Sequence, residues 1–393
     1  MENRIYLDNA ATTPISGEVL AEMMPCLTGI YGNSSSIHED GRQAQAIIDN
    51  ARDKIAQAFN AKSNEIYFTG GGSEANNWAI KGVAYANSFK GKHIITSSIE
   101  HDSVLESCKT LENEGFDVTY LPVDSTGLIS VAELMRNIRK DTILVSIMLV
   151  NNEVGTIQNI KALAKTAHEK NIIFHTDAVQ AIGCLKIDVT NMDVDLMSAS
   201  AHKIYGPKGT GMLYIKNGIQ IQDLIDGGNQ ERGKRGGTSN VAGIAGFGKA
   251  LEIAVRDMNV NNQKLKSLRT KFIKLVEEKI DMIKVNGHPF QKVQGIVSIS
   301  FELIEGESIL LMLDLAGISV STGSACTSNS LKPSHVLTAM GISDEGAQGT
   351  IRFSFGKGIR EDQIEIVVEE LCKAVQKLRA ISPLTKAGRK KNV

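Results

Sequence analysis

The chain has 393 residues, with 43 Lys and Arg against 44 Asp and Glu. This balanced charge provides no broad basic face, so the composition argues against a partner made of nucleic acid. Its five cysteines are scattered without a Cys-x-x-Cys pair, which excludes the usual spacing of a structural zinc site and favours a reducing compartment. The sequence holds no signal-peptide core and no apolar run of membrane-spanning length, so we expect a cytoplasmic protein without a membrane partner.

Short apolar runs alternate with helical patterns between about residues 60 and 220. The runs that predict buried strands lie at 66–68, 93–96, 143–150, 172–175, 196–199 and 212–215. Alternation of strands with helices is typical of an α/β domain with a mainly parallel sheet that helices cover on both faces.

The pattern changes after about residue 257. Charged helical sequence at 262–283 precedes an alternation of Val297, Ile299 and Phe301 with polar residues, which predicts a half-exposed antiparallel strand. We therefore expect a large domain over 15–257. A smaller α+β domain would combine 1–14 with 258–393, and would contain both Cys326 and Arg352.

Two residues that follow apolar runs suggest a cofactor site. Lys203 comes after the run 196–199 and before Gly206-Pro207, and a lysine partly desolvated at a strand end becomes nucleophilic because its pKa falls. Asp177 follows the run 172–174, at the strand end where open α/β sheets bind ligands. Pyridoxal phosphate requires a Schiff-base lysine, an anion beside its pyridinium nitrogen and donors for its phosphate. Taken alone, Lys203 also fits an ordinary solvated lysine, and Asp177 also fits the N-cap of a helix.

Two further segments add a phosphate turn and a thiol. The run Gly70-Gly71-Gly72-Ser73 lies between a strand and a helix, where backbone amides can bind phosphate, although glycine runs are more often simple loops. Cys326 is surrounded by small polar residues that cannot bury a thiol, which indicates an exposed nucleophile. Cys372, beside an apolar helix stripe, instead fits the more usual core position.

The order and spacing of these motifs resemble the cysteine desulfurases, which are pyridoxal phosphate enzymes of fold-type I. The motifs that carry the resemblance are Tyr6 to Thr13, Gly32-Asn33, Glu100-His101, Asn151-Asn152-Glu153, Asp177 to Gln180, Ser200 to Lys203, Arg235 to Thr238, Ser321 to Ser328 and Arg352-Phe353-Ser354. The resemblance covers nearly the whole chain. It implies a large domain built on a sheet of the seven-stranded type, and the removal of sulfur from L-cysteine. Alanine is then released, and a persulfide on Cys326 passes to an acceptor such as an iron–sulfur scaffold, or to tRNA thiolation or thiamine synthesis.

The resemblance also assigns roles to individual residues. It implies that Lys203 binds the cofactor covalently, that Asp177 pairs with the ring nitrogen and that Gln180 contacts the ring hydroxyl. The remaining assignments are the phosphate contacts Gly72, Ser73, Ser200 and His202, Thr238 reaching the phosphate of a neighbouring subunit in a homodimer, His101 stacking on the ring and transferring protons, Asn152 beside the ring hydroxyl or substrate, and Arg352 binding the substrate carboxylate.

Other functions remain open at this point. An aminotransferase of the same fold would not need the thiol of Cys326, whereas a selenocysteine lyase is harder to exclude because desulfurases commonly accept both cysteine and selenocysteine. A scaffold protein that has lost its chemistry is disfavoured because Lys203, Asp177, His101 and Cys326 are all present. Ser34 stands where relatives often have proline, a change that removes no catalytic atom.

Overall fold

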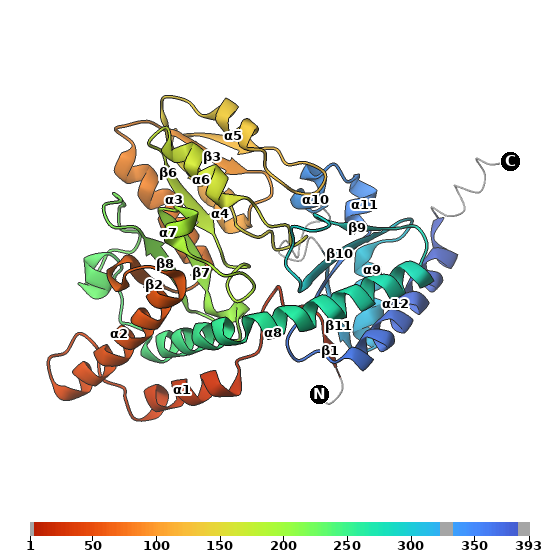
Figure 1. The fold of residues 1–393 in the computed structure, drawn as a ribbon, viewed down its shortest axis with the longest axis horizontal. Helices are drawn as coiled ribbons and strands as arrows, with labels where there is room; N and C mark the ends of the chain where they lie inside the picture. The colour runs from red at the N-terminus through yellow and green to blue at the C-terminus, as the bar shows by residue number, and fades with distance from the viewer. Residues whose placement is uncertain (1–3, 323–332, 384–393) are drawn as a thin grey trace.

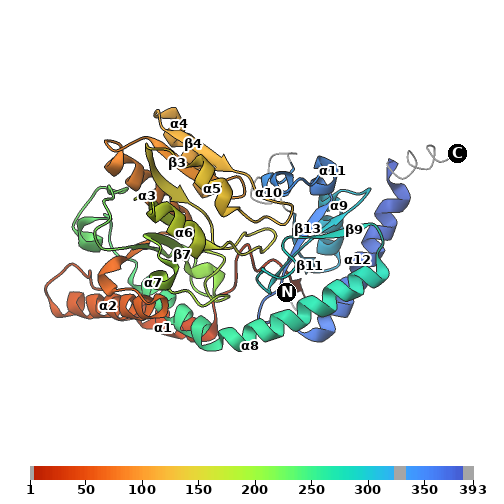
Figure 2. The same cartoon turned by 45° about the horizontal axis from the view of Figure 1, so that its top comes forward.

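The computed structural model describes residues 4–322 and 333–383, so Cys326 lies outside the described residues. The described chain forms two lobes, with the long helix α8 (Val241–Lys279) running along both (Figures 1 and 2). The larger lobe contains the seven-stranded sheet. The smaller lobe combines the N-terminal strand with the C-terminal third of the chain.

The larger lobe is organised around a mainly parallel sheet, as the sequence predicts. Its strands, in spatial order, are β2 (Ile66–Thr69), β8 (Gly211–Ile215), β7 (Leu196–Ser200), β6 (Ile173–Asp177), β5 (Thr142–Ser146), β3 (His93–Ser97) and β4 (Asp117–Leu121). The strands from β7 to β4 are parallel, and β8 is antiparallel to both of its neighbours. The predicted strand 143–150 is too long, because β5 ends at Ser146; beyond it only Ile147 and Leu149 still donate backbone hydrogen bonds to β6 carbonyls.

Helices bury both faces of this sheet. They are α1 (Gly17–Thr28), α2 (Glu39–Phe59), α3 (Gly72–Asn87), α4 (Asp102–Asn113), α5 (Val131–Asn137), α6 (Ile160–His168) and α7 (Val189–Met192), with short 3₁₀ turns at Ser63–Glu65, Ala201–Lys203 and Gln230–Gly233. Alternate strand residues enter different cores: Phe174 belongs to the same core cluster as Phe247 of α8, while its neighbour Ile173 packs against the cluster that contains Trp78 of α3. Burial on both faces explains the continuous apolar runs in the sequence.

Helix α8 begins at Val241, well before the predicted start near residue 262. Its first half is rich in glycine and alanine rather than in charges, because it packs closely on α2: a Cβ added at Gly248 would lie 2.9 Å from the Cβ of Ala51. The predicted domain boundary at 257/258 therefore falls inside this helix. Although α8 has 39 residues, no helix in the described ranges is apolar enough over a sufficient length to cross a membrane.

The smaller lobe holds two small sheets. Their strands are β12 (Ser321–Thr322), β13 (Thr350–Ser354), β10 (Ile296–Phe301) and β9 (Ile283–Asn286) in one antiparallel sheet, and β1 (Ile5–Tyr6) and β11 (Ile318–Ser319) as a parallel pair. The helices are α9 (Gly306–Leu315), α10 (His335–Ala339), α11 (Asp344–Gln348) and α12 (Glu361–Ile381).

Strand β10 corrects one detail of the sequence prediction. It is antiparallel to both neighbours, as expected, but all six of its residues are buried rather than half of them. Its polar side is covered because Ser298 and Ser300 face the amide of Asn286, whose Nδ2 lies 3.3 and 2.9 Å from their hydroxyl oxygens. These hydrogen bonds pair the Asn286 Nδ2 donor with both serines, although Asn286 Oδ1 is buried without a partner among the described residues.

Candidate active site

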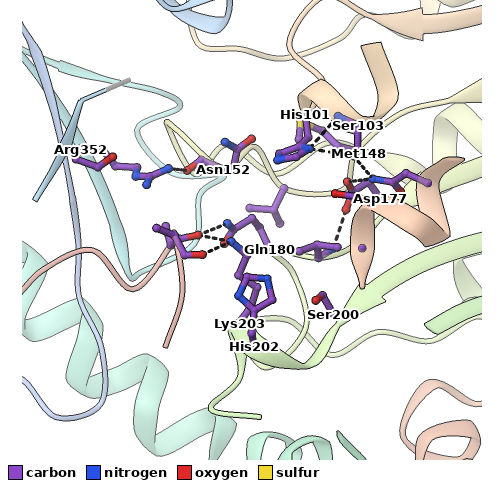
Figure 3. A pocket seen from close by; sticks show the side chains of 18 of the residues that line it. His101, Ser103, Met148, Asn152, Asp177, Gln180, Ser200, His202, Lys203 and Arg352 are labelled. Atoms are coloured by element: carbon purple, nitrogen blue, oxygen red, sulfur yellow. Dashed lines mark hydrogen bonds between the residues drawn. The ribbon is translucent and has the colours of Figure 1, made fainter. Parts of the chain in front are cut away.

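A pocket of about 420 Å³ opens where the parallel strands end, between the two lobes (Figure 3). Ten of the residues named from the sequence line it: Gly72, Ser73, His101, Asn152, Asp177, Gln180, Ser200, His202, Lys203 and Arg352. The carboxyl ends of β3, β5, β6 and β7 meet at one edge of the sheet, so segments distant in sequence bring these side chains together.

The turn between β2 and α3 is shaped to admit an anion. Helix α3 starts at Gly72 without a side-chain cap, which leaves its first amides without a partner inside the helix, and Gly72 and Ser73 line the pocket. Gly72 packs so closely that a Cβ there would lie 2.7 Å from Val179 Cγ2. This turn, together with Ser200 and His202, supplies neutral donors suited to a phosphate.

Asp177, the last residue of β6, is buried and held at both oxygens. Its Oδ2 accepts a 2.7 Å hydrogen bond from Asn76 Nδ2, and its Oδ1 accepts a 2.9 Å bond from the backbone amide of Val179. Asn76 was not identified from the sequence; its one signal is its place on the first turns of α3, facing the sheet. These two bonds fix the direction in which the carboxylate points.

His101 belongs to the same hydrogen-bond chain as Asp177. Asn76 Nδ2 also donates to Ser103 Oγ at 2.9 Å, and Ser103 Oγ lies 2.9 Å from His101 Nδ1 (Figure 3). Because His101 Nδ1 also accepts from the Ser103 amide at 3.1 Å, a neutral ring carries its proton on Nε2. The chain from Asp177 through Asn76 and Ser103 thus sets both the orientation and the tautomer of His101.

Glu100, beside His101, is fully buried and faces away from solvent. Its carboxyl group accepts from the amide of Met148 at 2.9 Å and from the hydroxyl of Ser97 at 2.6 Å. Burial raises its pKa to about 8, so at neutral pH most of this carboxyl is protonated. It therefore packs beneath the site without adding a full charge.

Lys203 lies on the turn after β7, where its amine contacts the N-terminal part of the chain. Its Nζ donates to the carbonyl oxygens of Ala10 at 2.5 Å and Ala11 at 2.9 Å. Burial, with Lys203 and Lys208 nearby, lowers the pKa of His202 to about 4, so His202 is neutral at physiological pH. The carbonyls of Ala10 and Ala11 have no side-chain signature, which is why the sequence did not reveal them.

Arg352 on β13 brings a charged fork to the pocket. Its Nη1 donates to the backbone oxygen of Asn152 and its Nη2 to Asp8 Oδ1, both at 3.0 Å. Its Nε and Asn152 Oδ1 are both buried without a hydrogen-bond partner. A guanidinium with a buried donor still to satisfy suits a small carboxylate ligand, and Asp8, a pocket residue not singled out from the sequence, partly balances its charge.

Thr238 is exposed and does not line this pocket. The loop that precedes it is nevertheless held firmly: Arg52 binds both carboxylate oxygens of Glu231 at 2.7 and 2.9 Å, and Arg235 binds both oxygens of Glu74 at 2.8 and 3.1 Å. Glu74 Oε2 also accepts from the amide of Gly70, so one carboxylate joins this loop to the phosphate turn.

Residues 5–367 match the family model described as aminotransferase class-V. The chain belongs to this family. Two curated relatives are both named cysteine desulfurase IscS. The one from Methanosarcina thermophila is 52% identical over 98% of this chain and 95% of its own length; the one from Shewanella piezotolerans is 47% identical over 98% and 96%. Within the family, the chain is thus a member of the cysteine desulfurases.

Solved structures share the fold of this chain. A NifS-like protein superposes with a TM-score of 0.91 at 38% sequence identity, over 96% of this chain and 100% of that one. A structure described as SspA in complex with cysteine superposes with a TM-score of 0.81 at 39% identity, over 90% and 99%. The fold-type I architecture expected from the sequence is confirmed.

Proposed function

We propose that the protein is a pyridoxal phosphate-dependent cysteine desulfurase that converts L-cysteine to L-alanine and leaves the sulfur as a persulfide on Cys326. The observation that carries this proposal is the convergence of Lys203, Asp177, His101 and Arg352 on one pocket. In the reaction the carbon–sulfur bond of cysteine breaks and a sulfur–sulfur bond to Cys326 forms. The electron pair left on carbon takes a proton, so no external oxidant or reductant is needed.

The residues present fit pyridoxal phosphate. Asp177, oriented by Asn76, would pair with the ring nitrogen. The uncapped start of α3 with Ser73, Ser200 and neutral His202 would hold the phosphate. When bound, this cofactor accepts electrons from the substrate α-carbon. The pocket thus provides the protein groups that the cofactor requires.

Proton transfer falls to Lys203 and His101. The Lys203 amine lines the pocket and donates to the carbonyls of Ala10 and Ala11, and it would move protons once the substrate has displaced it from the cofactor. His101 presents Nε2 to the pocket because Ser103 occupies its Nδ1. Arg352 would orient the substrate through its carboxylate, with Asn152 beside it.

The proposed partners extend beyond the substrate. Thr238 is exposed on a firmly held loop, which suits delivery of its hydroxyl to the phosphate of a second subunit in a homodimer. An acceptor protein, an iron–sulfur scaffold by family resemblance, would receive the sulfur from Cys326. We place this reaction in the cytoplasm.

Alanine formation from L-cysteine tests the proposal, with wild-type protein compared with Cys326→Ser. The expected result is turnover by the wild type, and no turnover by a variant that keeps its visible cofactor band. Alanine production by Cys326→Ser at the wild-type rate would mean that this thiol is not the sulfur acceptor. A parallel assay with selenocysteine separates the desulfurase from a selenocysteine lyase, which would act on that substrate alone.

A further inference from the structure

The turn that carries Lys203 has an unfavourable backbone conformation. The amides of Ile204 and Gly206 both bond to the carbonyl of Ala201, at 3.1 and 3.0 Å, which closes the turn tightly. Within it, Tyr205 has a φ of +64°, a left-handed conformation that a bulky side chain rarely adopts. Such strain persists only where the surrounding structure enforces it, and it is concentrated at functional sites.

The hydroxyl of Thr13 enforces this conformation from outside the turn. Thr13 is 2% exposed, and its Oγ1 donates to the carbonyl of His202 at 2.8 Å while accepting from the amide of Tyr205 at 2.8 Å. Its backbone amide also donates to His202 O at 3.0 Å. One buried hydroxyl therefore bonds to the residue before Lys203 and to the residue two positions after it.

The same stretch of chain receives the lysine amine. Thr13 is two residues beyond Ala11, whose carbonyl accepts from Lys203 Nζ at 2.9 Å, and Ala10 O accepts from both Lys203 Nζ and Gln180 Nε2. The distance between turn and acceptors depends on the bonds that Thr13 makes.

Tyr205 connects the turn to Lys357, which follows β13, the strand that carries Arg352. Its hydroxyl oxygen accepts from the amide of Lys357 at 2.7 Å, and the Lys357 ammonium lies 4.2 Å from the centre of its ring. On the same side, the amide of Ala10 donates to Ser354 Oγ of β13 at 2.9 Å. The lysine turn, the N-terminal segment and β13 thus form a closed ring of hydrogen bonds.

We propose that Thr13 is a positioning residue for Lys203: its buried hydroxyl fixes the turn so that the lysine amine faces the Ala10 and Ala11 carbonyls, and Tyr205 holds that turn against β13. This goes beyond the proposed function by assigning a role to a residue that touches neither cofactor nor substrate, and it rests on Lys203 being the cofactor lysine. Lys203 and Arg352, which lie in different lobes, are thereby held in a fixed position relative to each other.

The test measures the titration of Lys203 in the full-length, cofactor-free protein, by labelling with acetic anhydride over a range of pH followed by peptide mass spectrometry. Carbonyl acceptors favour the charged amine, so Thr13→Val is expected to lower the pKa of Lys203 by roughly 0.5 to 1 unit. Thr13→Ser keeps the hydroxyl and should restore the wild-type titration. Among the described residues, the charged or titratable groups that line the pockets beside the amine are His202, His101, Asp177, Asp8, Arg352, Cys184, Tyr205 and Lys357, and neither Thr13 variant alters any of them.

Thr270→Val is the matched control, because Thr270 loses a similar hydroxyl bond, to Lys266 O, on the exposed surface of α8. A Thr13→Val protein that is folded by circular dichroism and titrates like wild type would overturn the proposal, as would an equal shift in Thr13→Ser. Should Thr13→Val fail to fold, Tyr205→Phe takes its place, with a downward shift expected and an unchanged titration contradicting the idea. The labelling needs neither cofactor nor turnover. Failure of the proposed function would appear separately, as borohydride reduction fixing pyridoxal phosphate to a lysine other than Lys203.

Discussion

Asp177 has no freedom to turn, because Asn76 and the Val179 amide occupy both of its oxygens. We expect Asp177→Asn to bind cofactor yet lose about 10² to 10³ in turnover, the range seen when one preorganised electrostatic group is removed. Alanine formation and the cofactor absorption band report the two effects separately. Retention of full turnover by Asp177→Asn would remove Asp177 from the mechanism.

Arg352 is expected to act on substrate binding. Arg352→Ala removes the guanidinium, and the net loss of one charge-assisted hydrogen bond costs about 1.5–3 kcal/mol, so KM for L-cysteine should rise about 10- to 100-fold. Arg360→Ala is the control, since Arg360 pairs with Asp362 on the exposed surface. A KM for Arg352→Ala equal to that of the control would show that the guanidinium does not bind the carboxylate. Steady-state kinetics distinguish these outcomes.

The residues that we propose to carry the chemistry were predictable from the sequence as members of one site. Lys203, Asp177, His101 and Arg352 each follow a recognisable apolar run or motif, and the structure brings all four together. Asn76 and Asp8 were not identified because their roles depend on which neighbours the fold supplies. The carbonyls of Ala10 and Ala11 were hidden for a different reason: any residue has a carbonyl, so only the fold gives it a position.

At the scale of the elements, a charged cluster of His168, Asp193 and Asp195 links the end of α6 to the segment before β7. His168 lies 2.7 Å from Asp195 and 2.9 Å from Asp193, and these hydrogen bonds, with that to Asp195 the larger, raise its pKa above the ordinary value. Because the folded-state pKa is raised, the stabilisation is full below the unfolded pKa and is lost as pH rises through the folded one. Chemical denaturation of the wild-type protein at a series of pH values should therefore show the free energy of unfolding falling above about pH 6.5, as His168 loses its proton. The free energy of unfolding of His168→Gln should not show this fall with pH. A fall equal to that of the wild type would contradict the assignment.

Helix α8 stabilises the smaller lobe through aromatic packing. Phe272 is fully buried, with ring centres 4.8 Å from Phe353 and 5.4 Å from Phe355. Phe272→Ala should cost about 3–5 kcal/mol in the free energy of unfolding, because it removes apolar contacts and leaves a cavity. Urea denaturation measures the loss, with the exposed Phe290→Ala as a control expected to change little.

Elements were predicted well in type and less well at their ends. The strand pattern of the large sheet follows from its apolar runs, whereas α8 begins earlier than expected because its first half is selected for small residues that let it approach α2. The alternation in β10 suggested an exposed face, but tertiary hydrogen bonds among Ser298, Ser300 and Asn286 bury it. In both cases contacts with distant segments override the local pattern.

At the scale of the whole molecule, the pocket lies between the two lobes. The N-terminal segment and α8 each connect one lobe to the other. Arg352 comes from one lobe and Lys203 from the other, and Asp8 and Ala10 lie between them. The chemistry therefore depends on the assembled chain, which accounts for the family match spanning residues 5–367 rather than a local motif.

The proposed reaction requires that Cys326 receives the sulfur of L-cysteine. The most direct measurement is peptide mass spectrometry of the cofactor-loaded protein after brief exposure to L-cysteine without reductant, with alanine quantified in the same sample. If Cys326 accepts the sulfur, its peptide should gain one sulfur atom in step with alanine, and should lose that atom when dithiothreitol is added. Alanine produced without any added sulfur on that peptide would contradict it.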